Sequence, residues 1–163
     1  MKLPRLAITG IAVVVAVTGC ASPPPDADTR LSPKESQAEL LALLDDTQQL
    51  VGGEWQNEDS PSPRDCELPG SGDTGTTFTG ARSLAAPALD DATVSKVLDF
   101  WEGEGFEAGS KAMGALTSVL GVDPDNKANY VELLIGDQAT QLNGQAACVP
   151  GDTLTELDRV EGE

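Results

Sequence analysis

A stripe of apolar residues with helical spacing runs through the segment that follows residue 32. The stripe consists of Leu40, Leu43, Leu44 and Val51. Ser32 and Glu35 have the spacing of a capping box at its start, and Gly52 and Gly53 interrupt the pattern at its end. We therefore predict an amphipathic helix over residues 33–51 whose leucines belong to the core.

A second helical stripe follows residue 90. It consists of Val94, Val97, Leu98 and Trp101. Asp90 or Asp91 is suited to cap its start, and Gly103 and Gly105 end it. The pattern predicts a second helix that faces the core, with Trp101 as a buried anchor rather than a residue that stacks on a ligand.

The remaining segments have the composition of β-strands. Thr76 to Arg82 predict a strand after a turn-forming stretch, and Cys66 is expected in a short strand beyond a loop broken by Pro61 and Pro63. Further strands are predicted over residues 106–111, 115–121, 129–136 and 138–149. Within the last of these, Asn143–Gly144 is either a type I′ turn or a bulge.

This order of elements predicts an α+β fold of the two-layer sandwich type, with a mainly antiparallel sheet and two helices on one face. A single α+β domain over residues 33–150 accounts for all of these elements. Residues 151–163 are rich in Asp and Glu and are predicted to form an acidic, flexible tail.

The N-terminal residues have the layout of a secretory signal. Lys2 and Arg5 precede an uncharged run from Leu6 to Gly19, which is too short to span a bilayer as a helix. Small residues follow the run, so we predict a signal peptide over residues 1–19. A buried core helix is the alternative, but such a helix does not usually end in a glycine, a cysteine and three nearby prolines.

Val17-Thr18-Gly19-Cys20 resembles the lipobox of bacterial lipoproteins. The resemblance covers residues 1–20 alone. It implies that the Cys20 thiol carries a diacylglycerol, that cleavage makes Cys20 the first residue of the mature chain, and that the protein is anchored in the cell membrane on its extracytoplasmic face. Two or more acyl chains give durable anchoring, since each buried methylene contributes about 0.8 kcal/mol.

Residues 20–32 contain three consecutive prolines and few large apolar residues, which predicts a disordered, Pro-rich tether between the lipid and the domain. The whole pattern is similar to that of many small secreted lipoproteins of actinobacteria, whose functions are unassigned.

With Cys20 lipidated, Cys66 and Cys148 admit one pairing, and an exported compartment permits a disulfide there. Zinc is disfavoured because the chain has no CxxC motif and no histidine.

The charge balance narrows the choice of partners. The full chain has 10 basic and 27 acidic residues, for a formal net charge of −17. Such an excess argues against binding to nucleic acid or to anionic lipid, which both require basic patches. Most of the charge is interpreted as a solvated surface, with a metal ion or a cationic partner as the sharper alternative.

The chain lacks the residues of several common catalytic sites. Without histidine, Ser-His-Asp and Cys-His mechanisms are impossible. The pairs Ser95–Lys96 and Ser110–Lys111 are adjacent in sequence and do not form an S-x-x-K motif. Paired carboxylates such as Glu102 and Glu104 leave glycosidase chemistry formally open, but a surface position is the simpler interpretation.

Asp123, Asp125 and Asn126 form a cluster of hard oxygen ligands of the kind that calcium prefers. The EF-hand pattern fails because its twelfth position is Leu134 rather than glutamate. A turn between two strands explains the same residues, and we favour it. No cofactor and no metal site is predicted.

These observations predict a lipoprotein of the cell envelope that binds another envelope protein without catalysis. A carrier or sensor of a small ligand or cation is the alternative, and an enzyme that uses carboxylates has the weakest support. An apolar concavity in the structure would favour the carrier, whereas an exposed apolar patch would favour the interaction module. A cleft that contains buried carboxylates with shifted pKa values would favour the enzyme.

Overall fold

The computed structural model describes residues 31–85 and 89–162, so the predicted signal peptide, Cys20 and most of the tether lie outside the described residues. The helices are α1 (Pro33–Val51), α2 (Asp91–Gly103) and α3 (Thr153–Glu161). The strands are β1 (Trp55–Asn57), β2 (Ser60–Glu67), β3 (Thr74–Leu84), β4 (Glu107–Met113), β5 (Leu116–Val122), β6 (Tyr130–Ile135) and β7 (Thr140–Gln145). Among the described helices, none combines the length and the apolar character needed to cross a membrane.

The two long helices begin at side-chain caps. Ser32 Oγ accepts a hydrogen bond from the Glu35 backbone, while the Glu35 carboxylate accepts one from the Ser32 backbone at 2.8 Å, which completes the capping box. Gly52, with a φ of 77°, ends α1. Asp90 caps α2 by accepting a hydrogen bond from the backbone of Thr93 at 2.7 Å. The predicted bounds of the first helix, 33–51, are confirmed.

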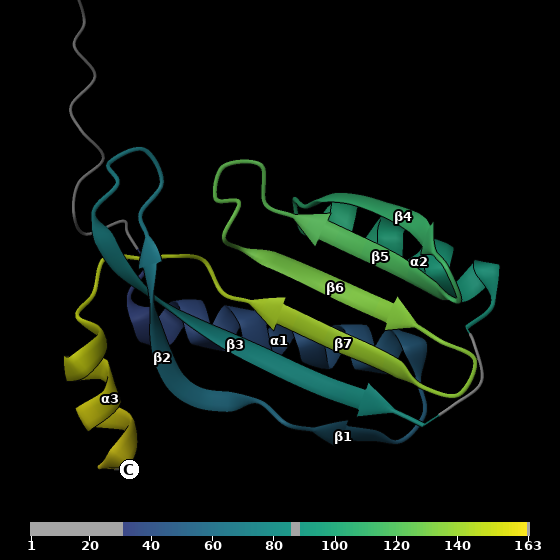
Figure 1. Cartoon of the computed structure of the whole chain (residues 1–163), viewed down its shortest axis with the longest axis horizontal. Coiled ribbons are helices and arrows are strands. Elements are labelled where there is room, and N and C mark those ends of the chain that lie inside the picture. The colour runs from purple at the N-terminus through teal and green to yellow at the C-terminus, as the bar shows by residue number, and fades with distance from the viewer. Residues whose placement is uncertain (1–30, 86–88, 163) are drawn as a thin grey trace, which may run out of the picture.

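The strands form one antiparallel sheet in the order β1-β3-β7-β6-β5-β4, and β2 also pairs with β3 (Figure 1). β1 pairs with the last residues of β3 and β2 with its first half, so the two short segments share one edge of the sheet. β4 forms the opposite edge. Neighbours in sequence from β4 to β7 are neighbours in the sheet, as short connections between antiparallel strands require.

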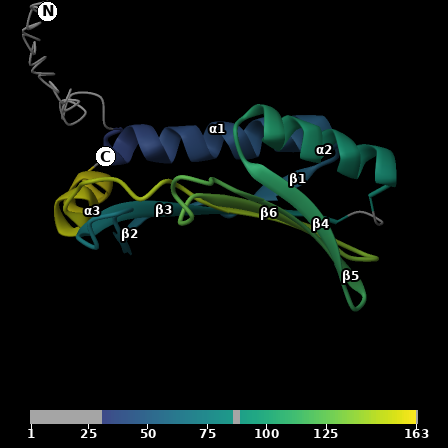
Figure 2. The same ribbon diagram turned by 90° about the horizontal axis from the view of Figure 1, so that it is seen from above.

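Helices α1 and α2 lie side by side over one face of the sheet, and α3 packs at its end beside β2 (Figure 2). The core lies between the two layers and contains Leu40, Leu44, Phe78, Val97, Trp101, Val119, Val131, Leu133, Ile135, Leu142 and Ala146. The α+β two-layer sandwich predicted from the sequence is therefore present. Trp101 is fully buried, as a core anchor should be.

The structure places a helix, α3, where the sequence predicted a flexible acidic tail. Asp152 caps this helix by accepting a hydrogen bond from the Thr155 backbone at 2.8 Å. Thr153 donates its hydroxyl to Asp65 on β2 at 2.6 Å, so the helix is attached to the edge of the sheet. The prediction of a flexible tail rested on acidic composition, which indicates neither the helix cap nor the contact with β2.

Strand β2 runs through Pro61 and Pro63, where the sequence predicted a loop. An edge strand tolerates proline because one of its sides lacks a partner for the backbone N–H. The pairing with β3 shifts register between Ser60 and Arg64, which accommodates the two rings. The three-residue strand β1 was not predicted.

The structure contains the predicted disulfide between Cys66 and Cys148, whose Cα atoms are 5.9 Å apart. Cys66 pairs in register with Gly75, and Val149 forms a bridge with Thr76. The disulfide therefore joins the two chain segments that flank the start of β3.

Candidate functional site

A groove of about 470 Å³ lies on the helical side of the molecule, between α1 and the C-terminal end of α2. Its wall is completed by the residue that precedes β4, the turn after β5 and the segment that follows β7. Four separate stretches of the chain thus converge on it, since the end of α2 runs directly into the residue before β4. This volume is within the range of about 300–1,000 Å³ that is usual for small-molecule sites.

Carboxylates surround this groove. Glu39 and Asp46 lie two turns apart on the same side of α1, Glu104 follows the last turn of α2, and Asp123 follows β5. No lysine or arginine is found in the part of the lining that the structure describes. The groove therefore carries a concentrated negative charge, which attracts cationic groups.

The floor of the groove is apolar. Leu40 is buried there, and Leu43, Phe100 and Phe106 are partly buried against the core. Ala146, the residue after β7, completes this surface. The groove combines an apolar floor with an acidic rim, and a ligand that fits it carries both apolar and cationic groups.

Asp123 is engaged within its own turn. Its Oδ1 atom accepts hydrogen bonds from the backbone of Asp125 at 2.9 Å and of Asn126 at 3.1 Å, and its Oδ2 atom accepts one from Asn129 at 3.0 Å. These bonds explain the cluster as turn chemistry. The described residues contain no group of three or more carboxylates, cysteines or histidines placed to hold a metal ion.

Carboxyl groups with displaced pKa values occur at helix starts. Hydrogen bonds from the Ser32 side chain and backbone lower the pKa of Glu35, and bonds from Thr93 and Thr155 lower those of Asp90 and Asp152. These shifts stabilise the charged form and are typical of capping residues.

The side chains considered as catalytic from the sequence lie at the surface. Ser95, Lys96, Ser110 and Lys111 are exposed, as are Glu102 and Glu104. Of these, Glu104 is the one that lines the groove.

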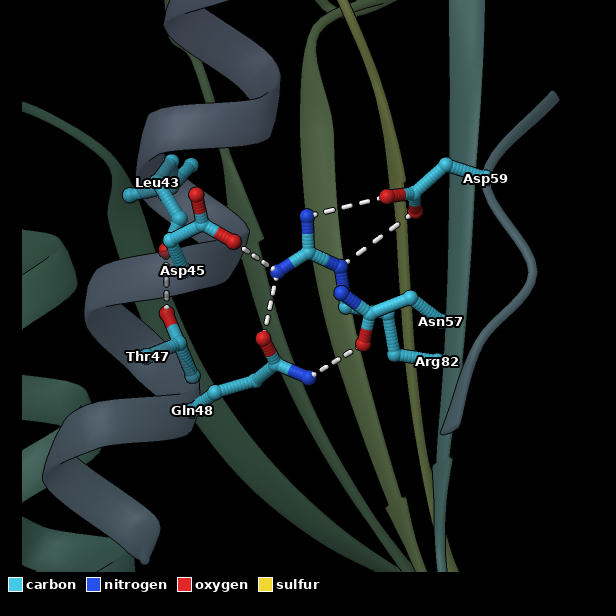
Figure 3. A network of polar contacts seen from close by, with 7 residues as sticks. All are labelled: Leu43, Asp45, Thr47, Gln48, Asn57, Asp59 and Arg82. Atoms are coloured by element: carbon cyan, nitrogen blue, oxygen red, sulfur yellow. Dashed lines mark hydrogen bonds and ion pairs between the residues drawn. The ribbon is translucent and has the colours of Figure 1, made fainter. Parts of the chain in front are cut away.

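A buried arginine links α1 to the sheet (Figure 3). Arg82 on β3 is 3% exposed. Its Nε and Nη2 atoms donate to the two carboxylate oxygens of Asp59 at 3.3 and 3.0 Å. Its Nη1 atom donates to Asp45 and, at 2.6 Å, to Gln48, both on α1. Gln48 in turn donates to Asn57 at 2.8 Å, which ties in β1.

This network is structural rather than a ligand site. Four of the N–H groups of Arg82 are committed to side chains of the protein. Burial acts to lower the pKa of Arg82, but the bonds to Asp59 and Asp45 outweigh it and raise the pKa, so the guanidinium stays charged. The network sets the position of α1 and hence of the groove wall that α1 provides.

Neither the groove nor the network was predicted from the sequence. Helical spacing places Glu39 and Asp46 on one face of α1, but their approach to Glu104 depends on how α1 and α2 pack. Arg82 was predicted only as a strand residue, although an arginine among alternating apolar positions is a signal of a buried ion pair. Cys20, the predicted lipidation site, is outside the described residues.

Comparison with known proteins supports the fold. No protein-family model and no curated protein matches the sequence. Among solved structures, the chain is similar to the crystal structure of a DUF4853 family protein from Actinomyces odontolyticus ATCC 17982, with a TM-score of 0.57 and 16% sequence identity over 77% of this chain and 72% of that one. At this level of identity the similarity concerns the fold alone.

Proposed function

We propose that the chain is a lipoprotein anchored through Cys20 to the extracytoplasmic face of the cell membrane, and that its domain binds another envelope protein without catalysis. The observation that carries the proposal is the groove between α1 and α2, whose acidic rim distinguishes it from the purely apolar concavity expected of a carrier. The partner contributes a segment in which basic residues flank one or two apolar side chains.

Charge complementarity supports a basic partner. Glu39, Asp46 and Glu104 come from α1 and from the end of α2, and all three are exposed at the rim. Such an arrangement speeds encounter with a cationic segment and rejects acidic ones. Leu43 and Phe106 lie below the rim, where an apolar side chain of the segment gains binding energy by leaving water.

The disulfide between Cys66 and Cys148 agrees with an exported location, because the cytoplasm keeps most thiols reduced. The anchor itself is tested in cells. Cys20→Ser should abolish labelling by a fatty-acid analogue and move the protein from the membrane fraction to the soluble one. If the variant keeps its lipid label and its membrane position, the anchoring proposal is wrong.

The binding site is tested with a defined probe. A short fluorescent peptide of lysines around two leucines should bind the purified protein, whereas the same peptide with glutamates in place of lysines should not. Glu39→Lys combined with Asp46→Lys should weaken binding by about tenfold or more. The matched control, Asp73→Lys combined with Asp137→Lys, makes the same change in net charge at exposed positions outside the groove.

Equal losses in both double variants would show that net charge alone drives binding and would contradict the groove. Crosslinking on intact cells then asks whether one envelope protein co-purifies with the wild type and with the control but not with the groove variant. A common partner for all three proteins would place its binding site elsewhere.

The alternative function is that of a carrier or sensor for a small ligand or cation. The volume of the groove favours this alternative, because it matches a small molecule as well as a peptide segment. Calcium and a free organic diamine are the discriminating probes. If either displaces the lysine peptide at concentrations well below those of simple salt screening, the carrier replaces the interaction module.

A further inference from the structure

Strand β4 ends the sheet with one side of its backbone unpaired. Every residue of β4 except Ala108 is exposed. On its other side β4 pairs with β5 over seven consecutive residues without a register shift. A regular, uncovered edge of this kind is able to accept a further strand.

The opposite edge is protected against such pairing. There β2 carries Pro61 and Pro63 and shifts register against β3, and α3 packs beside it. Prolines, irregular pairing and covering helices are the devices that block strand addition. Over the described residues, β4 has none of the three on its outer side, and its charges are limited to Glu107 and Lys111.

The register within the sheet shows which backbone groups face outward. The backbone N–H of Asp123, the residue after β5, donates to the carbonyl of Asn129, the residue before β6, at 3.0 Å. Because the bonding direction alternates along an antiparallel strand, the odd-numbered residues of β5 form their backbone hydrogen bonds with β6 and the even-numbered residues form theirs with β4. Gly109 pairs with an even-numbered residue of β5 and directs its groups inward. Ala108 and Ser110 therefore direct their N–H and C=O groups out of the sheet.

We propose that β4 pairs antiparallel with β4 of a second copy of this chain, about a two-fold axis at Gly109, to form a continuous sheet across a homodimer. In this register Ala108 exchanges both backbone hydrogen bonds with Ser110 of the second copy, and the same exchange occurs on the other side of the axis. Glu107 lies directly opposite Lys111 of the second copy, and the two-fold axis generates a second, identical pair.

Charge selects this register over its neighbour. If the axis passed through Ser110, Lys111 would lie opposite Gly109 of the second copy and the ion pairs would be lost. Opposite charges on directly facing strand residues are favourable, and like charges are unfavourable. Glu107 and Lys111 are placed symmetrically about Gly109, so the strand is complementary to itself in the antiparallel direction.

The two-fold axis makes Gly109 a site for a diagnostic crosslink. Residues on the axis form a pair without hydrogen bonds, in which the Cα atoms lie about 4.5 Å apart, within the range that a disulfide spans. A Cβ atom added at Gly109 meets nothing within 4 Å, so a side chain is accommodated there. Gly109→Cys in the full lipidated chain should give a disulfide-linked dimer on intact cells under mild oxidation. Asp137→Cys, at an exposed turn, should give far less.

Charge variants in the Gly109→Cys background test the register. Lys111→Glu or Glu107→Lys alone should lower the dimer yield by about fivefold or more, and the two together should restore it. Lys127→Glu, the same change at an exposed residue outside β4, should leave the yield unchanged. Absence of the crosslink, equal yield from Asp137→Cys, or failure of the charge exchange to restore it would each overturn the proposal. In the same background, the groove variant Glu39→Lys with Asp46→Lys should crosslink as well as Gly109→Cys alone does, so the dimer is judged separately from the peptide site.

Discussion

Trp101 of α2 donates its indole N–H to Oγ1 of Thr47 on α1 at 3.0 Å, and both side chains are fully buried. The Thr47 hydroxyl donates in turn to the backbone carbonyl of Leu43 at 2.8 Å. Both Trp101 Nε1 and Thr47 Oγ1 therefore have a hydrogen-bond partner inside the core. The link holds α1 beside α2, and the groove lies between these two helices.

Thr47→Val keeps the shape of the side chain and removes the acceptor. The indole N–H of Trp101 is then buried without a partner, so the free energy of unfolding should fall by about 1–3 kcal/mol. Urea unfolding followed by tryptophan fluorescence measures the change. Thr79→Val is the matched control, because Thr79 is half-buried on β3. A loss no larger for Thr47→Val than for Thr79→Val would contradict the role of the bond.

The ion pair between Arg82 and Asp59 should show strong coupling. Asp59→Ala removes the carboxylate that receives two bonds and leaves a buried guanidinium partly uncompensated, at a cost of about 3 kcal/mol or more. Arg82→Met removes the buried charge itself and should cost less, since Asp45 remains accessible to water.

A double-mutant cycle tests this order. The double variant should be more stable than the sum of the two single losses predicts, by about 0.5–3 kcal/mol. If the two losses add, Arg82 and Asp59 are not coupled and the prediction is wrong. If Arg82→Met is the more destabilising change, the carboxylates rather than the arginine depend on the pair. Asp46→Ala on the same helix serves as the control, because Asp46 is exposed at the groove rim.

The predictable parts of the fold are those with local signals. Helix α1 was predicted with its observed bounds because Ser32, Glu35 and Gly52 mark both of its ends. The four strands after α2 were predicted to within a few residues from their composition and turns. In each case, residues near in sequence decide the outcome.

The parts that escaped prediction depend on contacts between distant residues. Helix α3 is docked through a hydrogen bond from Thr153 to Asp65, and these two residues are 88 positions apart in the sequence. Strand β2 contains two prolines, and its edge position, which alone permits them, is a property of the whole sheet. The groove is formed where Glu39 and Glu104 approach across a helix interface, and a single sequence carries no signal for that approach.

The disulfide between Cys66 and Cys148 closes a long loop, with a sequence separation of 82 residues. On the chain-entropy model, Cys66→Ala combined with Cys148→Ala should lower the free energy of unfolding by about 4.5 kcal/mol. Denaturant unfolding in the presence and absence of a reductant measures this loss. The reductant should destabilise the wild type and leave the double variant unchanged. Equal sensitivity in both proteins would mean that the bond adds no stability.

Gly80 should not tolerate a methyl group. A Cβ atom at this position of β3 would lie 2.4 Å from the Leu44 side chain and 2.9 Å from Asp59 Oδ1. Leu44 is fully buried and has little room to move, so Gly80→Ala should cost about 1–3 kcal/mol through overpacking. Gly103→Ala makes the same change at the last residue of α2, where a Cβ meets nothing within 4 Å, and should not lower the melting temperature. Similar effects at both glycines would contradict the close packing of α1 on β3.

The helix caps predict how stability responds to acid. The pKa values of Glu35, Asp90 and Asp152 are lower in the folded chain than their ordinary values of 4.5, 3.8 and 3.8, because each charged carboxylate accepts hydrogen bonds at a helix start. The stability that these groups provide is therefore fully present above the ordinary values and is lost as pH falls through the folded ones.

Asp90→Asn combined with Asp152→Asn retains an acceptor oxygen at each cap and removes the titration. Thermal melting between pH 7 and pH 2 should show that the variant loses less stability below pH 4 than the wild type does, although both melt at similar temperatures near neutrality. Asp73→Asn combined with Asp137→Asn changes the same number of carboxylates at exposed loop positions and should keep the acid response of the wild type. If the cap variant and this control follow the same curve, the lowered pKa values do not govern acid unfolding.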